Sequence, residues 1–199
     1  SITGPGIWYT ATAASPRGIS ALIHNFVWVW ATEWVFFVFE VLGVFALVYF
    51  IDKIDRKTHL KLTYSFALAS LGTLFLIIGI ISFMMWPGDN AFYLTGSASD
   101  AFFGTNTFPH MFLRIGFMIM MSGVIGLIIS SAMKKENLPL ANELTKTMGV
   151  VSLIGGFLVM ISFMWYVNTL PSNAEALLPI YLTGLIQPSI ILIVAFTLY

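Results

Sequence analysis

The chain contains no cysteine and little charge. The absence of cysteine excludes disulfides, thiolate zinc sites and cysteine-ligated iron–sulfur clusters. Charged residues make up 9% of the 199 residues, whereas soluble domains carry about a quarter. The formal net charge is zero, so the sequence offers nucleic acid no basic surface. Because hydrophobic residues make up 58% of the chain, we expect an integral membrane protein whose surroundings are a lipid bilayer.

Long apolar runs predict an all-α membrane protein with about five transmembrane helices in one domain over residues 1–199. The runs cover approximately residues 20–51, 62–86, 109–133, 147–167 and 178–199. The first run is longer than a bilayer needs, so we expect its start to lie in the membrane interface or to project as an extended helix. Residues 91–108 are predicted to form an outer loop long enough to fold over a site. The sequence begins Ser-Ile-Thr-Gly and ends within an apolar run, so we expect a portion of a longer polypeptide or partner helices from other subunits.

Basic residues set the expected orientation. Seven of the nine Lys and Arg residues flank the connections at residues 52–61 and 134–146, which follow the first and third spans. Positive charge favours the cytoplasmic side of short loops. We therefore expect both connections in the cytoplasm and the N-terminus outside.

Three ionisable residues lie within otherwise apolar spans: Glu33, Glu40 and Arg114. A charged group at that depth costs a few kcal/mol on insertion scales, and it is usually retained because it faces a partner, a cofactor or a water path. These three positions are therefore our first candidates for a functional site.

His110 and Arg114 are four residues apart, so they share a helix face at the predicted outer end of the third span. A neutral imidazole is a common axial ligand of haem iron, and a neighbouring guanidinium can pair with a haem propionate. These residues are candidate cofactor ligands, with His110 as the metal ligand. The alternative is an interfacial histidine beside an arginine that extends toward the membrane surface.

Glu33 and Glu40 are seven residues apart, so both carboxylates point to the same side of the first span. Two acids ordered inward from the surface are typical of a proton path, or of a ligand with a proton relay behind it. They are our candidate catalytic residues. The alternative is a pair of structural acids bonded to neighbouring hydroxyl groups.

Three stretches resemble subunit I of the cytochrome bd-type quinol oxidases. Residues 4–9 (Gly-Pro-Gly-Ile-Trp-Tyr) are similar to an outer segment of that family. Residues 33–40 and the Asp-Arg-Lys-Thr-His stretch at 55–59 resemble its glutamate-bearing helix and cytoplasmic turn. Residues 106–135 are similar to the helix that carries the proximal histidine of its low-spin haem b. The Gly-Arg-Gln-Pro-Trp signature of the family is absent.

The resemblance implies a bd-oxidase-like helical bundle in a bacterial-type inner (cytoplasmic) membrane, with one or more b haems near the outer face. It implies that His110 ligates the low-spin haem b, and that Glu33 and Glu40 match acids near the high-spin haems and the proton channel. It also implies quinol or quinone as substrate, with other membrane and cytochrome subunits of a respiratory complex as partners. The family's long quinol-binding loop is replaced here by residues 168–177, and the sequence starts after the position of the family's preceding histidine-bearing helix. A bd-like relative that exchanges electrons with quinone or outer-face cytochromes therefore fits better than a complete oxidase.

Three functions follow as hypotheses. The first is the membrane redox subunit of a quinol-oxidising complex, with a haem b held by His110. The second is a haem-free membrane anchor that shapes a quinone pocket in a larger respiratory complex. The third is a transporter that uses Glu33 and Glu40 as its proton site, and it is the weakest because few polar residues line the other spans.

Overall fold

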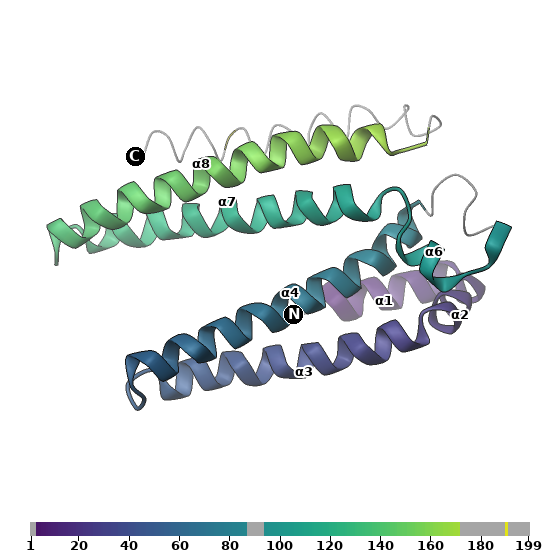
Figure 1. The fold of residues 1–199 in the computed structure, drawn as a ribbon, viewed down its shortest axis with the longest axis horizontal. Helices are drawn as coiled ribbons and strands as arrows, with labels where there is room; N and C mark the ends of the chain where they lie inside the picture. The colour runs from purple at the N-terminus through teal and green to yellow at the C-terminus, as the bar shows by residue number, and fades with distance from the viewer. Residues whose placement is uncertain (1–2, 87–93, 172–189, 191–199) are drawn as a thin grey trace. The chain divides into compact units, whose positions relative to one another are not determined.

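The computed structural model describes residues 3–86, 94–171 and 190, and over these residues it contains seven helices and no strand (Figure 1). Four helices are long and apolar enough to cross a membrane: α3 (Val27–Phe50), α4 (Arg56–Met85), α7 (Thr107–Met133) and α8 (Leu138–Asn168). The prediction of an all-α, multi-pass membrane protein is confirmed. Four of the five predicted spans correspond to these helices, and the fifth, residues 178–199, falls outside the described residues except for position 190.

The chain divides into two compact units. Unit 1 contains α1 (Thr3–Ala14), α2 (Pro16–Asn25), α3, α4 and α6 (Ala98–Phe102), and unit 2 contains α7 and α8. In unit 1 the helices α3 and α4 run antiparallel side by side, and in unit 2 so do α7 and α8 (Figure 1). Each unit is therefore built on one helical hairpin.

We predicted one span over residues 20–51, but the structure breaks this apolar run into two helices. Helix α2 ends at Asn25, the backbone of Phe26 turns to φ −114° and ψ 22°, and α3 begins at Val27. The side chain of Phe26 is fully buried, and the break lets it pack into the core of unit 1. The 24 residues of α3 extend about 36 Å, enough to cross a bilayer without α2.

The apolar runs predicted that the second and fourth spans begin at residues 62 and 147. In the structure both helices begin earlier, at Arg56 and Leu138. Helix α4 starts at Arg56 because the Asp55 carboxylate accepts the backbone N–H groups of Lys57 and Thr58 at 3.1 and 3.2 Å. Helix α8 starts at Leu138, where Asn137 Oδ1 accepts the N–H of Leu140 at 3.2 Å. Capping side chains extend both helices into polar sequence that hydropathy alone leaves out.

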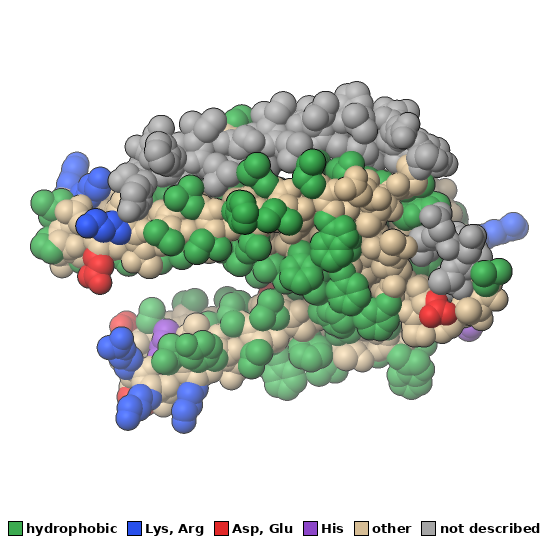
Figure 2. Space-filling model, turned by 45° about the horizontal axis from the view of Figure 1, so that its top comes forward, with side chains coloured by type: hydrophobic (Ala, Val, Ile, Leu, Met, Phe, Trp, Pro, Cys, Tyr) green, Lys and Arg blue, Asp and Glu red, His purple; other side chains and the backbone are tan. Residues whose placement is uncertain are grey.

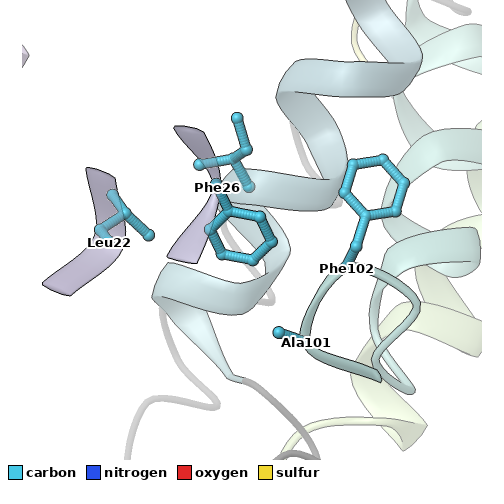
Figure 3. Packing of buried hydrophobic residues seen from close by; sticks show 5 residues of the cluster. Leu22, Phe26, Ala101 and Phe102 are labelled. Atoms are coloured by element: carbon cyan, nitrogen blue, oxygen red, sulfur yellow. The ribbon is translucent and has the colours of Figure 1, made fainter. Parts of the chain in front are cut away.

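The core of unit 1 gathers apolar side chains from α2, α4 and α6 and from the break between α2 and α3. Leu22, Phe26, Ile80, Ala101 and Phe102 form one buried cluster, shown in Figure 3. The segment 91–108, predicted to be a loop, contains α6, whose Ala101 and Phe102 pack into this cluster. A short helix forms there because the ring of Phe102 lies against α4 at Gly79, where a Cβ atom would collide with it.

Unit 2 is held together by close approach of two backbones. Small residues line the contact: a Cβ on Gly116 would come within 2.9 Å of the Val159 nitrogen, and one on Gly123 within 2.5 Å of the Ser152 nitrogen. The hydroxyls of Ser130 and Thr145 are 2.9 Å apart across the same contact. Small residues and hydroxyl pairs are the usual means by which helices associate in lipid, where the hydrophobic effect gives no help.

The charged side chains gather at the ends of the hairpins. Lys and Arg side chains lie at the α3–α4 and α7–α8 connections, and the flanks between the helix ends are apolar (Figure 2). Most side chains of α3 remain exposed in the described structure, among them Trp28, Trp34 and Phe45. In a membrane such a surface faces lipid or other helices.

Candidate functional site

His110 lies in the first turn of α7, and Arg114 lies one turn further along the same face. The Arg114 Nε–H donates to His110 Nε2 at 3.1 Å, as the four-residue spacing allows. His110 is 6% exposed, whereas Arg114 is exposed. The pair thus joins a buried imidazole to a guanidinium on the surface of unit 2.

Helix α8 supplies the second wall of this site. The ring of Tyr166 lies 5.5 Å from the His110 ring, centroid to centroid, at an interplanar angle of 58°. The close packing of α7 on α8 places this ring, because Gly116 and Val159 allow the two backbones to approach. The imidazole is therefore fixed on one side by an aromatic ring and on the other by Arg114.

Asn106 adds a polar group one turn before His110. It is fully buried, and its Oδ1 accepts the hydroxyl of Thr169 at 3.1 Å, which ties the start of α7 to the end of α8. Its Nδ2 is buried and has no acceptor among the described residues. A buried donor without an acceptor is costly, so this amide marks a place where a further acceptor would be favourable.

The hydrogen bond from Arg114 fixes the protonation of the imidazole. A ring nitrogen that accepts an N–H carries its lone pair and no proton. With Nε2 as the acceptor, the imidazole of His110 is in the neutral form, and this is the form that ligates metals.

Among the described residues, His110 and Arg114 are the ones that could hold a b-type haem. The imidazole has a nitrogen lone pair, Arg114 has the charge to pair with a propionate, and the Asn106 amide has an N–H with no acceptor among the described residues. Ligation would require Arg114 to release Nε2, and its exposed position leaves room for that movement. Within the described ranges no group of three or more His, Cys, Asp or Glu side chains gathers, so these ranges do not present a site for a protein-only metal ion.

Glu33 and Glu40 lie on α3 in unit 1, and both are half-buried. Glu40 Oε1 accepts the hydroxyl of Ser70 on α4 at 2.9 Å, so its carboxylate faces the other helix of the hairpin. Glu33 makes no hydrogen bond or ion pair with any described residue. Glu40 is thus held by a hydrogen bond, whereas Glu33 can bind a proton or a further partner.

The structure brings His110 and Arg114 into contact, whereas Glu33 and Glu40 share a helix without a hydrogen bond between them. Glu33 and Glu40 belong to unit 1, and His110 and Arg114 belong to unit 2. Four further residues contact these pairs or each other, and the sequence analysis did not propose them as site residues: Ser70, Asn106, Tyr166 and Thr169. Only Asn106 carried a sequence signal, because it lies four residues before His110 on the same helix face.

Comparisons with protein-family models, curated proteins and solved structures find no match. The assignment of a function therefore depends on the geometry of the two pairs.

Proposed function

We propose that this chain is a haem b-containing membrane electron-transfer subunit that exchanges electrons with quinol or quinone near the outer face of a bacterial-type inner membrane. The observation that carries the proposal is the buried His110, whose Nε2 accepts the Nε–H of the exposed Arg114. Unit 2 presents this lone pair in a membrane helix, where few side chains other than histidine can ligate iron.

The residues take distinct parts. His110 Nε2 would hold the iron, Tyr166 would keep the imidazole ring in place, and Arg114 with the Asn106 amide would pair with propionate oxygens. When bound, the haem supplies a one-electron carrier within the bilayer. Arg114 also offsets the negative charge that the propionates bring into a low-dielectric region.

Glu33 and Glu40 would take and pass the protons that quinol chemistry releases. They are separated by about 10 Å along the helix axis, so a proton passing between them needs a chain of hydrogen-bonded water molecules. Ser70 holds the Glu40 carboxylate toward α4, which keeps the acceptor oxygen in one place. The N-terminus would lie outside and the connections at 52–61 and 134–146 in the cytoplasm, with other membrane and cytochrome subunits and the quinone pool as partners.

One observation favours a second function. The nitrogen that would ligate iron already accepts a hydrogen bond from Arg114, so His110 is satisfied without a metal. The chain would then be a haem-free anchor that shapes a quinone pocket within a respiratory complex.

The haem and iron content of the purified complex distinguishes the haem-containing subunit from the haem-free anchor. The proposal predicts that His110→Ala lowers the haem b content by one equivalent per chain. The matched control His24→Ala, an exposed histidine at the end of α2, should leave the content unchanged. Equal haem content in all three proteins, or no iron in the wild type, would refute the proposal.

A further inference from the structure

An open groove of about 480 Å³ runs between α3 and α4 on the surface of unit 1. Two buried residues with little or no side chain, Gly43 and Ala69, lie at its floor. Its open side is bordered by Phe39, Leu42 and Leu68, which are all at least 60% exposed. The groove therefore offers an apolar surface to the hydrocarbon of the membrane.

Lysine side chains lie at the end of the groove nearer the α3–α4 connection. On α4, Lys61 comes seven residues before Leu68, so it lies on the same helix face as that wall of the groove. On α3, Tyr49 comes seven residues after Leu42, and the Lys53 ammonium lies 3.5 Å from the centre of the Tyr49 ring. Both lysines are exposed. Each wall of the groove thus leads to an ammonium group.

The charge of these lysines is not neutralised within the described residues. No Asp or Glu in the described part of the chain forms an ion pair with Lys53 or Lys61. The Asp55 carboxylate caps the first turn of α4 instead. Residues 51–61 contain four Lys or Arg and two Asp residues, an excess of two positive charges, and blue side chains gather at this end of the hairpin in Figure 2. An anionic group complements this surface.

The length of the groove restricts its occupant. Its lining on α3 runs from Phe36 to Ala46, about 15 Å along the helix axis. Because the hydrocarbon core of a bilayer is about 30 Å thick, this is the depth of one leaflet. A partner helix that crosses the membrane would need a longer groove, whereas a phospholipid acyl chain occupies one leaflet only.

The polarity of the wall also suits a hydrocarbon chain. Ser65 is the one polar side chain among the described lining residues, and its hydroxyl donates to the Lys61 carbonyl at 3.0 Å. The occupant therefore leaves no polar group of the wall without a partner.

We propose that this groove binds an anionic phospholipid, with one acyl chain between α3 and α4 and the phosphate paired with the ammonium groups of Lys53 and Lys61. Basic residues beside a membrane helix attract anionic headgroups, and the groove supplies the matching apolar contact. The site lies within unit 1 and does not depend on a haem at His110. Lipid binding and haem content can therefore fail separately.

The test is native mass spectrometry of the full protein, purified in detergent, with dioleoylphosphatidylglycerol or dioleoylphosphatidylcholine added. The two lipids have the same acyl chains, but only the first has a net negative charge. We expect the first phosphatidylglycerol to bind about fivefold or more tightly than the first phosphatidylcholine. Inorganic phosphate at the same concentration should not displace it, because phosphate cannot fill the apolar groove.

Charge variants locate the headgroup. Lys53→Gln combined with Lys61→Gln should weaken phosphatidylglycerol binding by about five- to twentyfold and leave phosphatidylcholine binding unchanged. The matched control combines Lys134→Gln with Lys135→Gln, two exposed lysines at the α7–α8 connection, and should keep the wild-type affinity.

Filling variants locate the acyl chain. Ala46→Phe should block the groove and abolish this phosphatidylglycerol site. Val44→Phe, which adds a ring to an exposed position of α3 outside the groove, is the control and should retain it. Ser65→Phe fills the groove from an exposed position of α4, and it replaces Ala46→Phe if that variant does not fold.

The inference is overturned if the two lipids bind the wild type equally, if the control lysine pair loses as much affinity, or if a folded filling variant keeps the site. A stable dimer of the wild-type chain that retains no lipid, and that Ala46→Phe dissociates, would place a helix in the groove and would also overturn it.

Discussion

At the residue scale, the polar side chains of this chain act through short, local hydrogen bonds. Arg114 donates to His110 within one helical turn, and Asp55 accepts from residues two and three positions further along. Such contacts follow from spacing, so the sequence could predict that His110 and Arg114 share a face. It could not predict that Ser70 binds Glu40 or that Thr169 binds Asn106, because those contacts join residues 30 and 63 positions apart and depend on how the helices pack.

Asp55 provides a pH-dependent test at this scale. The Thr58 hydroxyl, which donates to Asp55 Oδ1 at 2.6 Å, and then the N–H of Thr58 hold the pKa of this carboxyl below its ordinary value. A carboxyl whose pKa is lower in the folded state stabilises the fold above its unfolded pKa, and this contribution is lost as the pH falls through the folded pKa. We expect Asp55→Ala to lower the thermal midpoint at neutral pH, and the difference from wild type to shrink at acidic pH.

The measurement is thermal unfolding by circular dichroism in detergent at about pH 7 and about pH 2.5. Asp55→Asn should keep most of the cap and lose its pH dependence, because asparagine caps helices equally well without a charge. Asp52→Ala, in the same exposed connection, is the control and should leave the midpoint unchanged. A difference between Asp55→Ala and wild type that stays constant over the pH range would contradict the assignment.

At the scale of elements, the apolar runs predicted where membrane helices lie but not where they start or break. Asp55 and Asn137 extend α4 and α8 into polar sequence, and the burial of Phe26 interrupts the first run. Helix α6 forms because Ala101 and Phe102 have a core to pack against, and composition alone cannot supply that information. Hydropathy indicates whether a helix lies in lipid or in water, whereas caps and tertiary contacts determine the residues at which it begins and ends.

The hairpin of unit 2 gives a test of element packing. A Cβ at Gly123 would meet the backbone of Ser152, whereas one at Gly126 would meet only the flexible side chain of Met148. We expect Gly123→Ala to destabilise the α7–α8 contact by about 1–3 kcal/mol, because a backbone cannot move aside as a side chain can.

The control Gly126→Ala, on the same helix, should change stability by less than about 1 kcal/mol. The free energy of unfolding in mixed micelles with increasing dodecyl sulfate measures both variants. Equal effects of the two substitutions would show that the two backbones are not in contact at Gly123.

At the scale of the whole molecule, the number and direction of the spans decide which residues share a side of the membrane. The sequence predicted the class of protein and four described spans well, because length and hydropathy are properties of the chain itself. Orientation, haem content and partners stay predictions, since they depend on a membrane and on other molecules.

The absence of cysteine makes orientation directly measurable, since any introduced cysteine is unique. We expect Ser99→Cys to react with a membrane-impermeant maleimide in intact spheroplasts. Lys57→Cys and Lys135→Cys should react only after permeabilisation, because both connections are predicted to be cytoplasmic. Labelling at position 57 or position 135 in intact spheroplasts would contradict the proposed topology.

If the Nε2 lone pair of His110 ligates a haem iron, free imidazole should rescue a variant that lacks this side chain. Reduced-minus-oxidised spectra of the purified complex would be recorded for His110→Gly with and without added imidazole. We expect that a b-type band present in the wild type is lost in the variant and returns when imidazole fills the vacated space. A band that keeps its position and intensity in His110→Gly without imidazole would contradict the account.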